Sequence, residues 1–323
     1  MSDREEKTGK NDNGKKNKGG KRNKIIAIEM IILVLLIMAA AAIFIQKDKS
    51  VKEAAKIHNQ KAKKTEQTPQ AAQKENEIEE ETEGTEEETG DRDEAVPDRS
   101  NFAVQPGVSV GTTEQSDEKI VYLTLDDGPS DNTQAVLDIL DKYNAKATFF
   151  VTGEMPEYKD MIKAAYDKGH TIGMHTYSHD YAKVYASVDA YFQDLDQIGQ
   201  MVQEEIGYVP CFIRFPGGSS NTVSKKYTAG IMSTLVQEVQ NRGYQYYDWN
   251  GSSGDGSVRT TEELVAQATS FDSNNIILLC HDSHGKQTTV EALPQIIEHY
   301  QSLGYTFKAL DRDSFVAHHG VNN

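Results

Sequence analysis

Short runs of strand-forming residues alternate with segments of helical spacing from residue 120 to residue 310. The strand-like runs cover residues 120–125, 147–151, 170–174, 211–215, 244–249, 276–280 and 305–310, and the helical segments cover residues 133–143, 158–167, 188–206, 225–241, 261–270 and 290–303. Strands that alternate with helices pair in parallel, because each helix returns the chain to the same end of the sheet. We therefore expect an α/β domain of seven parallel strands, and its length favours a short, irregular barrel over a two-sided open sheet.

Ionisable residues follow several of these strands. Asp126 and Asp127 end the first strand, His175 and His179 follow the third, and His281 ends the sixth. In parallel α/β folds the chemistry gathers at the carboxyl ends of the strands. Taken alone, the two aspartates could be turn or helix-capping residues, and the two histidines could be surface residues. Their joint placement at strand ends of one domain favours a shared site.

The spacing of His175 and His179 suits metal binding. Histidines four residues apart share one face of a helical turn, about 5–6 Å from each other. A carboxylate from Asp127 would complete a three-ligand site of the kind that zinc hydrolases use. The residue after His175 is Thr176, so the segment lacks the glutamate base of the zincin peptidases. A metal-dependent peptidase is therefore disfavoured, and Asp126 is the nearest candidate for the base.

Residues 119–310 resemble the NodB-homology polysaccharide deacetylases, carbohydrate esterase family 4. The family's first motif, TFDDG, matches residues 124–128, its second, H-S/T-x-x-H, matches residues 175–179, its third, similar to RPPY, matches residues 214–217, and its fifth, LxH, matches residues 279–281. The motifs stand in the family's order and at the predicted strand ends. The resemblance implies a fold like a deformed (β/α)7 barrel and a site that hydrolyses acetyl amides.

Two positions depart from the family's pattern. The fourth motif, DSxDW, aligns with residues 252–256, where Asp255 is kept but the leading aspartate and the closing tryptophan are absent. Gly217 stands where the third motif has an aromatic residue. Both changes concern the shape of the substrate cleft more than the chemistry. The cleft could be more open, or Tyr247 or Trp249 could replace the missing aromatic, although each could equally belong to the core.

The resemblance implies a metal centre with a neighbouring base. Asp127, His175 and His179 would hold a divalent metal, Zn²⁺ with Co²⁺ as an alternative. Asp126 would act as the general base on water. Arg214 would orient Asp126 and favour its charged form.

The resemblance also implies a general acid and an oxyanion site. His281 would protonate the leaving amine, with Asp255 as the carboxylate that stabilises its charged form. The backbone N–H of Gly217 would help to stabilise the oxyanion, and Leu279 would contact the acetyl methyl group. His284 is the one other histidine close enough in sequence to be an alternative acid.

The N-terminal part of the chain predicts a membrane anchor. Residues 25–45 carry a single charge, Glu29, and about 20 apolar residues are enough to cross a bilayer. Residues 1–24 are basic and should stay in the cytoplasm. We therefore expect a basic cytoplasmic tail at 1–24, a single-pass transmembrane signal-anchor at 25–45, and the rest of the chain outside the cell membrane. A signal peptide cleaved near the alanines at 39–42 is the alternative.

Residues 46–116 lack apolar periodicity and are rich in acidic residues. Such a segment cannot bury enough apolar surface to offset its conformational entropy, so we expect a disordered linker before a catalytic domain at 117–323. The formal net charge of −16 argues against a nucleic-acid partner, and no protein partner is inferred. The sequence neither supports nor excludes a disulfide between Cys211 and Cys280.

A domain held outside the cell predicts a target in the envelope. Family members with this arrangement resemble peptidoglycan N-acetylglucosamine deacetylases, so we expect an acetylated polysaccharide as the substrate. Chitooligosaccharides, an exopolysaccharide, N-acetylmuramic acid and acetylxylan remain alternatives with the same chemistry. A non-catalytic wall-binding module is a further alternative, but such a module has no need for Asp126 or His281.

Overall fold

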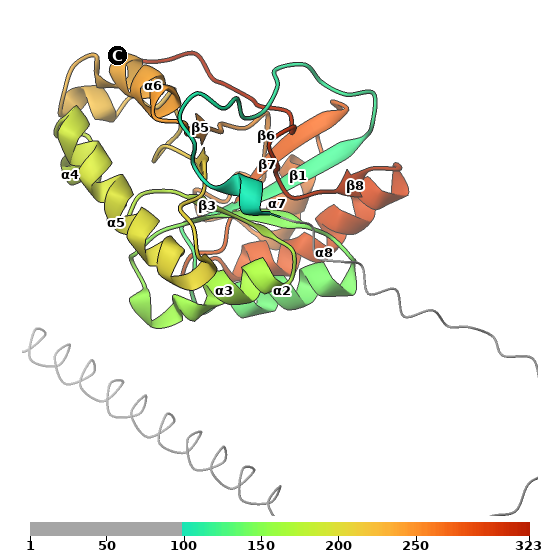
Figure 1. Cartoon of the computed structure of the whole chain (residues 1–323). Coiled ribbons are helices and arrows are strands. Elements are labelled where there is room, and N and C mark those ends of the chain that lie inside the picture. The colour runs from blue at the N-terminus through green and yellow to red at the C-terminus, as the bar shows by residue number, and fades with distance from the viewer. Residues whose placement is uncertain (1–98) are drawn as a thin grey trace, which may run out of the picture. The chain divides into compact units, whose positions relative to one another are not determined.

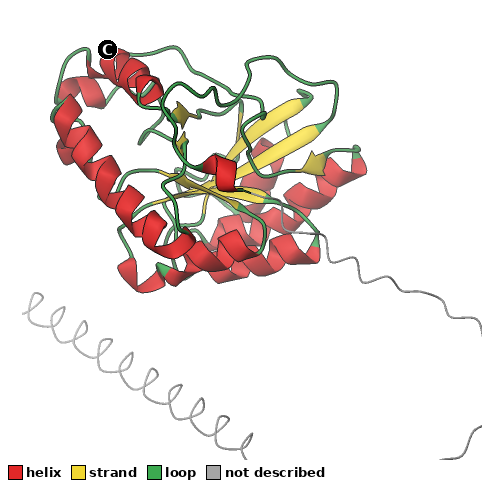
Figure 2. Ribbon diagram, in the orientation of Figure 1, coloured by secondary structure: helices red, strands yellow, loops and turns green. Residues whose placement is uncertain are grey.

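A computed structural model describes residues 99–323, which build one parallel sheet with helices packed on it (Figures 1 and 2). The strands are β1 Ile120–Asp126, β2 Ala147–Val151, β3 Thr171–Met174, β4 Phe212–Ile213, β5 Gln245–Tyr246, β6 Gly251–Ser252, β7 Asn275–His281 and β8 Thr306–Phe307. They lie in the order β5-β4-β3-β2-β1-β7-β6, and β8 pairs with β1. The two end strands of this path, β5 and β6, are not paired with each other. The described residues therefore form a parallel half-barrel, in agreement with the expected α/β fold of NodB-homology type.

The helices that connect the strands are largely those that the apolar spacing predicts. They are α2 Thr133–Lys142, α3 Asp160–Asp167, α4 Tyr181–Val184, α5 Val188–Ile206, α6 Ile231–Asn241, α7 Thr261–Ala268 and α8 Gln287–Ser302, with 3-10 turns η1 Ser100–Phe102, η2 Pro156–Tyr158 and η3 Ser224–Lys226. Helix α5 has the predicted bounds. Helix α6 begins later than predicted, because Gly230 precedes it with a left-handed φ of +75°. Helices α2, α3 and α8 lie side by side along one side of the sheet (Figure 1).

The central strand β1 divides its side chains between two cores. Val121, Leu123 and Leu125 belong to the large cluster formed with the helices. Ile120 and Tyr122 belong to a second cluster inside the half-barrel. Since successive side chains of a strand point to opposite faces, Thr124 and Asp126 continue the inner face. The pleat of β1 thus places an aspartate at the carboxyl end of the half-barrel's interior.

The two cysteines are buried and free. Cys280 packs in the cluster shared with the helices, whereas Cys211 packs in the inner cluster. The two thiols therefore contribute to packing on different faces of the sheet, and the disulfide that the sequence left open is not formed.

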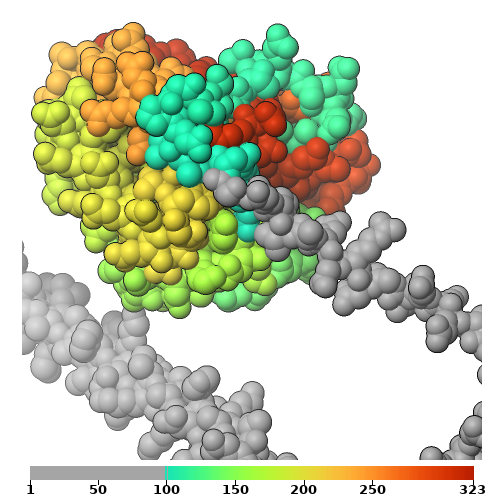
Figure 3. Space-filling view, in the orientation of Figure 1, coloured from blue at the N-terminus to red at the C-terminus, as the bar shows by residue number. Residues whose placement is uncertain are grey.

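The folded domain begins earlier than residue 117. The Arg99 guanidinium donates to the carbonyl oxygen of His170 at 2.7 Å, and the Phe102 ring meets Phe212 edge-on at 5.2 Å. Figure 3 shows this segment, in blue-green, on the surface of the domain beside the red C-terminal residues. The expected linker at 46–116 is therefore wrong for residues 99–116. The packing of this segment on the domain could not be predicted from the sequence, because its apolar residues are isolated and show no periodicity.

The remaining N-terminal expectations lie outside the described residues. These are the basic tail at 1–24, the anchor at 25–45 and the part of the linker that precedes residue 99. Within residues 99–323, no helix combines the length and the apolar character that crossing a bilayer requires.

Candidate active site

Asp127, His175 and His179 meet at the carboxyl ends of β1 and β3. The Nε2 atoms of His175 and His179 each lie 3.4 Å from Asp127 Oδ1. One ligand atom from each residue lies within 4.8 Å of the other two. The three residues that the sequence analysis named as metal ligands are therefore brought together.

This set fits a divalent cation. Asp127 Oδ1 is buried and has no hydrogen-bond partner within the described chain, which is costly unless something else satisfies it. His175 Nδ1 lies 2.8 Å from the carbonyl oxygen of Arg214, so its hydrogen is at Nδ1 and the lone pair of Nε2 faces Asp127. Burial raises the pKa of Asp127, but the three nearby histidines outweigh it and lower the pKa. The donor chemistry is that of a zinc-type site with two nitrogens and one oxygen.

His175 and His179 lie on a loop, where the sequence analysis expected a helical turn. Residues 175–180 follow β3 without helical structure, and Thr176 and His179 have positive φ angles of +90° and +47°. Asp194 on α5 holds this loop. One of its carboxylate oxygens accepts from the backbone N–H groups of Tyr177 at 2.6 Å and Ser178 at 3.0 Å, and the other accepts from the Ser178 hydroxyl at 2.6 Å. The loop, rather than a helix, turns both rings toward Asp127.

Asp126 is held by Arg214 rather than by the histidines. Arg214 Nη1 donates to Asp126 Oδ1 at 2.7 Å and lies 2.8 Å from Thr124 Oγ1. Its Nε and Nη2 donate to the backbone carbonyls of Tyr247 and Asp248, so the fully buried guanidinium has its hydrogen-bond partners. Asp126 Oδ2 lies 3.8 Å from His175 Nε2. One oxygen of Asp126 is thus fixed while the other faces the ligand set.

His281 and Asp255 form an ion pair on the other side of Asp127. His281 Nδ1 lies 2.8 Å from Asp255 Oδ1, and Asp255 Oδ2 accepts from the His281 backbone N–H and the Thr289 hydroxyl, both at 2.8 Å. Burial lowers the pKa of His281, but Asp255 outweighs burial and the pKa rises to about 9. The His281 Nε2 atom lies 3.9 Å from Asp127 Oδ2. A protonated imidazole is therefore held beside the ligand set at neutral pH.

Gly217 and Leu279, expected to contact the substrate, lie in the turn after Arg214 and on β7. Gly217 lies in the turn after Arg214 with a φ of +75°, which a side chain would strain. Leu279 alternates with Cys280 along β7, so it shares a face of the strand with His281. Of the two aromatics named as replacements at the cleft, Tyr247 is fully buried in the inner core, whereas Trp249 is partly exposed.

Asp282 directly follows His281, and the sequence analysis gave it no role. Burial raises its pKa to about 7. Its Oδ2 accepts from the Thr133 hydroxyl at 2.6 Å, and its backbone N–H donates to the Asp126 carbonyl at 3.2 Å. A Cβ on Gly128 would lie 2.3 Å from Asp282 Oδ1, so this position requires glycine. Its sequence signal was its place directly after His281 at a strand end.

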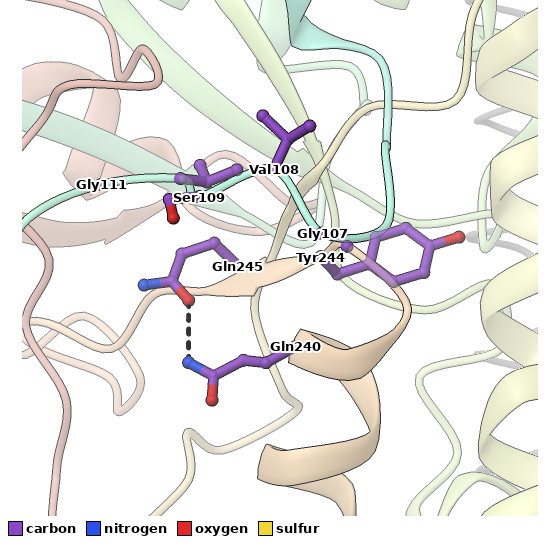
Figure 4. Close-up of a pocket in the computed structure, with 9 residues that line it drawn as sticks. Gly107, Val108, Ser109, Gly111, Gln240, Tyr244 and Gln245 are labelled. Carbon is purple, nitrogen blue, oxygen red and sulfur yellow. Dashed lines mark hydrogen bonds between the residues drawn. The ribbon is translucent and has the colours of Figure 1, made fainter.

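His284 does not reach the ligand set. It is exposed and pairs with Asp131 at 3.0 Å, so it does not replace His281 as the acid. A cavity of about 400 Å³ also lies away from the site residues (Figure 4). It is lined by residues 107–111 and by Gln240, Tyr244 and Gln245, at the amino-terminal end of β5. Neither feature belongs to the candidate active site.

Comparisons with known proteins agree with this geometry. The family model described as polysaccharide deacetylase matches residues 113–236. The YheN protein of Bacillus subtilis, a relative assigned to the polysaccharide deacetylases, is 30% identical over 217 residues, which cover 64% of this chain and 72% of the relative. A peptidoglycan-N-acetylglucosamine deacetylase of Bacillus cereus is 29% identical over 226 residues, covering 65% of this chain and 78% of that protein.

Solved structures are similar as well. The catalytic domain of peptidoglycan N-acetylglucosamine deacetylase from Eubacterium rectale has a TM-score of 0.63 and 47% identity, over 65% of this chain and 97% of that one. The polysaccharide deacetylase Bc1974 from Bacillus cereus has a TM-score of 0.53 and 30% identity, over 64% of this chain and 97% of that one. With the half-barrel and the Asp-His-His set, these similarities establish that the chain belongs to the polysaccharide deacetylase family.

Proposed function

We propose that this protein removes N-acetyl groups from a polysaccharide of the cell envelope, most directly from the N-acetylglucosamine of peptidoglycan. The observation that carries the proposal is the different environment of two adjacent carboxylates. Asp127 faces two imidazoles, whereas Asp126 is paired with the buried Arg214. One carboxylate is thus available to bind a cation and its neighbour to accept a proton.

Asp127, His175 and His179 would hold the metal, and we favour Zn²⁺ because hydrolytic zinc sites use this kind of ligand set. When bound, a divalent metal polarises the acetyl carbonyl and makes water more acidic. The partly exposed side chains of Asp127 and His179 leave one side of the set open to the substrate.

The residues around the ligand set supply the proton transfers. Asp126 accepts the proton of the attacking water, and Arg214 keeps this carboxylate in place through the 2.7 Å contact between Nη1 and Oδ1. His281 gives its proton to the sugar nitrogen as the C–N bond breaks, so that acetate and a free amine are released. Pro216 has no N–H, so the next residue in this turn, Gly217, supplies the backbone donor that would stabilise the oxyanion.

The relatives support N-acetylglucosamine of peptidoglycan as the first substrate to test. The Eubacterium rectale structure and the Bacillus cereus relative are both named for that activity. We further propose that residues 25–45 anchor the chain in the cell membrane with the domain outside, where this polymer lies. Sequencing the N-terminus of the mature protein tests the anchor, and a start near Ile43 would instead mean a cleaved signal peptide.

Released acetate is the measurement that tests the activity. The full-length protein is incubated with peptidoglycan, chitooligosaccharides, N-acetylated exopolysaccharide and acetylxylan, and we expect the fastest release from peptidoglycan. Chelation should abolish release, and Zn²⁺ or Co²⁺ should restore it. Asp126→Asn should lower kcat by about 10²–10⁴-fold, the usual contribution of general base catalysis, while Zn²⁺ remains bound.

Three results would contradict the proposal in different ways. No acetate from any polymer would leave a wall-binding module as the better explanation. Turnover that persists after chelation would show that the reaction does not require a metal. Loss of Zn²⁺ from Asp126→Asn would mean that the roles of Asp126 and Asp127 are exchanged.

A further inference from the structure

Two tyrosines of one short element contact the turn that carries Gly217. Tyr181 begins α4, and Tyr185 caps its C-terminus. Their rings lie 5.7 Å apart. Neither residue belongs to the motifs by which the family resemblance was identified, and no role follows for them from the ligand set. Tyr185 contacts the Pro216 carbonyl of this turn, and Tyr181 lies close to Gly217.

Tyr185 fixes the peptide between Pro216 and Gly217. Its ring is fully buried, and its hydroxyl donates to the Pro216 carbonyl at 2.8 Å. In a trans peptide the C=O and the following N–H point in opposite directions. The N–H of Gly217 therefore points away from Tyr185. Among residues 99–323, this N–H donates to no backbone carbonyl.

Tyr181 lies between a ligand histidine and the same glycine. Its ring meets the His179 ring edge-on, with centroids 5.7 Å apart and an interplanar angle of 82°. A Cβ on Gly217 would lie 2.6 Å from the Tyr181 hydroxyl oxygen. The space in which a side chain at position 217 would begin is thus occupied by a phenol from another element.

The Tyr181 hydroxyl is free to contact a ligand. It makes no hydrogen bond to another residue of the described chain, and its side chain is only half-buried. A phenolic hydroxyl can donate one hydrogen bond. The contact of its ring with His179 places the phenol beside the proposed ligand set.

We propose that Tyr181 is a substrate-contacting residue whose hydroxyl, together with the N–H of Gly217, donates to the acetyl oxygen as it becomes negatively charged. This inference rests on the proposed deacetylase function and adds a side-chain donor to it. The absence of a side chain at Gly217 is what allows the phenol to reach this position.

The test compares Tyr181→Phe with the unmodified full-length protein. This variant keeps the ring against His179 and removes only the hydroxyl. We expect kcat on peptidoglycan to fall by about 10²-fold, the usual effect of losing one oxyanion donor, while KM changes little. Acetohydroxamate, whose carbonyl oxygen can occupy the same place, should bind the Zn²⁺-loaded variant about 10-fold more weakly. Zn²⁺ affinity should stay unchanged, and Tyr227→Phe, at an exposed tyrosine, should behave like the unmodified protein.

The outcomes separate this inference from the proposed function. Values of kcat and acetohydroxamate affinity within twofold of the unmodified protein would overturn the role of Tyr181. A parallel loss of Zn²⁺ affinity would also overturn it, because the phenol would then act through His179. If the unmodified protein releases no acetate but Tyr181→Phe still weakens acetohydroxamate binding, the proposed function fails and the contact stands.

Discussion

Among the carboxylates near His281, Asp255 has the largest effect on the pKa of the imidazole, and Asp126 and Asp127 raise it further. Burial alone would leave this imidazole neutral at physiological pH, but its contact with Asp255 raises the pKa to about 9. The raised pKa therefore favours the charged form through the neutral range, as the proposed role of general acid requires. The same shift contributes to stability. Because the folded pKa lies above the unfolded value near 6.5, the contribution is complete below pH 6.5 and is lost as the pH rises through about 9.

Asp255→Asn should move the alkaline limb of the pH–rate profile to lower pH. The amide removes the negative charge that outweighs burial, so the pKa of His281 falls from about 9 toward or below 6.5. The measurement is kcat/KM for acetate release between pH 5 and 10. Asp167→Asn, which changes an exposed ion pair with Lys163, should leave the limb in place. An alkaline limb that does not move in Asp255→Asn would show that this carboxylate does not control His281.

At the residue scale, the sequence predicted those site residues whose side-chain type and position at a strand end indicate metal binding or proton transfer. Asp127, His175 and His179 could be named from residue type and from their places at strand ends. Asp282 and Tyr181 could not, because each acts through a close approach to a glycine. Such contacts depend on how the loops after separate strands pack against one another, and residue spacing carries no information about that.

At the element scale, the loop after β3 depends on a carboxylate from α5. Asp194 accepts three hydrogen bonds from Tyr177 and Ser178, between the two ligand histidines. Its removal leaves two loop N–H groups without their partner. The candidate metal site therefore depends on a contact between a helix and a loop that are separate in sequence.

Asp194→Ala should lower Zn²⁺ affinity by about 10–100-fold, as expected when a group that orients metal ligands is lost. Competition with a chromophoric chelator measures this change. Asp194→Asn keeps one carbonyl acceptor and should have a smaller effect. Asp196→Ala, on the exposed side of the same helix, is the control. An Asp194→Ala protein that binds Zn²⁺ as tightly as the unmodified one would show that the loop holds its shape without this carboxylate.

The elements that the sequence predicted well are the long, periodic ones. Helix α5 has the predicted bounds, and β1 extends by one residue to Asp126. Helix α4 has four residues and β6 has two, which is too short for a period to be seen. The histidine pair was placed on a helical turn because spacing alone allows it, whereas the positive φ of Thr176 and His179 excludes a helix there.

At the scale of the whole described domain, residues 99–116 close the inner side of the half-barrel. Phe102 packs in the cluster that contains Phe212 and Tyr247. Arg312, near the C-terminus, donates to the carbonyl of Ala103 at 2.7 Å. The Arg214 guanidinium donates to the carbonyl of Tyr247 from the same region. The segment before the first strand thus belongs to the core that contains Tyr247, a hydrogen-bond partner of Arg214.

Phe102→Ala in the full-length protein should lower the free energy of unfolding by about 3–5 kcal/mol, the usual cost of deleting a buried phenylalanine. Phe102 is 8% exposed and lies edge-on against Phe212, so its removal leaves a cavity that the surrounding strands cannot fill. Urea denaturation followed by circular dichroism measures the loss. Val108→Ala is the matched control, because Val108 is 44% exposed in the same segment and should change stability by less than about 0.5 kcal/mol. A loss below about 1 kcal/mol for Phe102→Ala would place the segment outside the cooperative core, since a side chain that stabilises the fold cannot be deleted without cost.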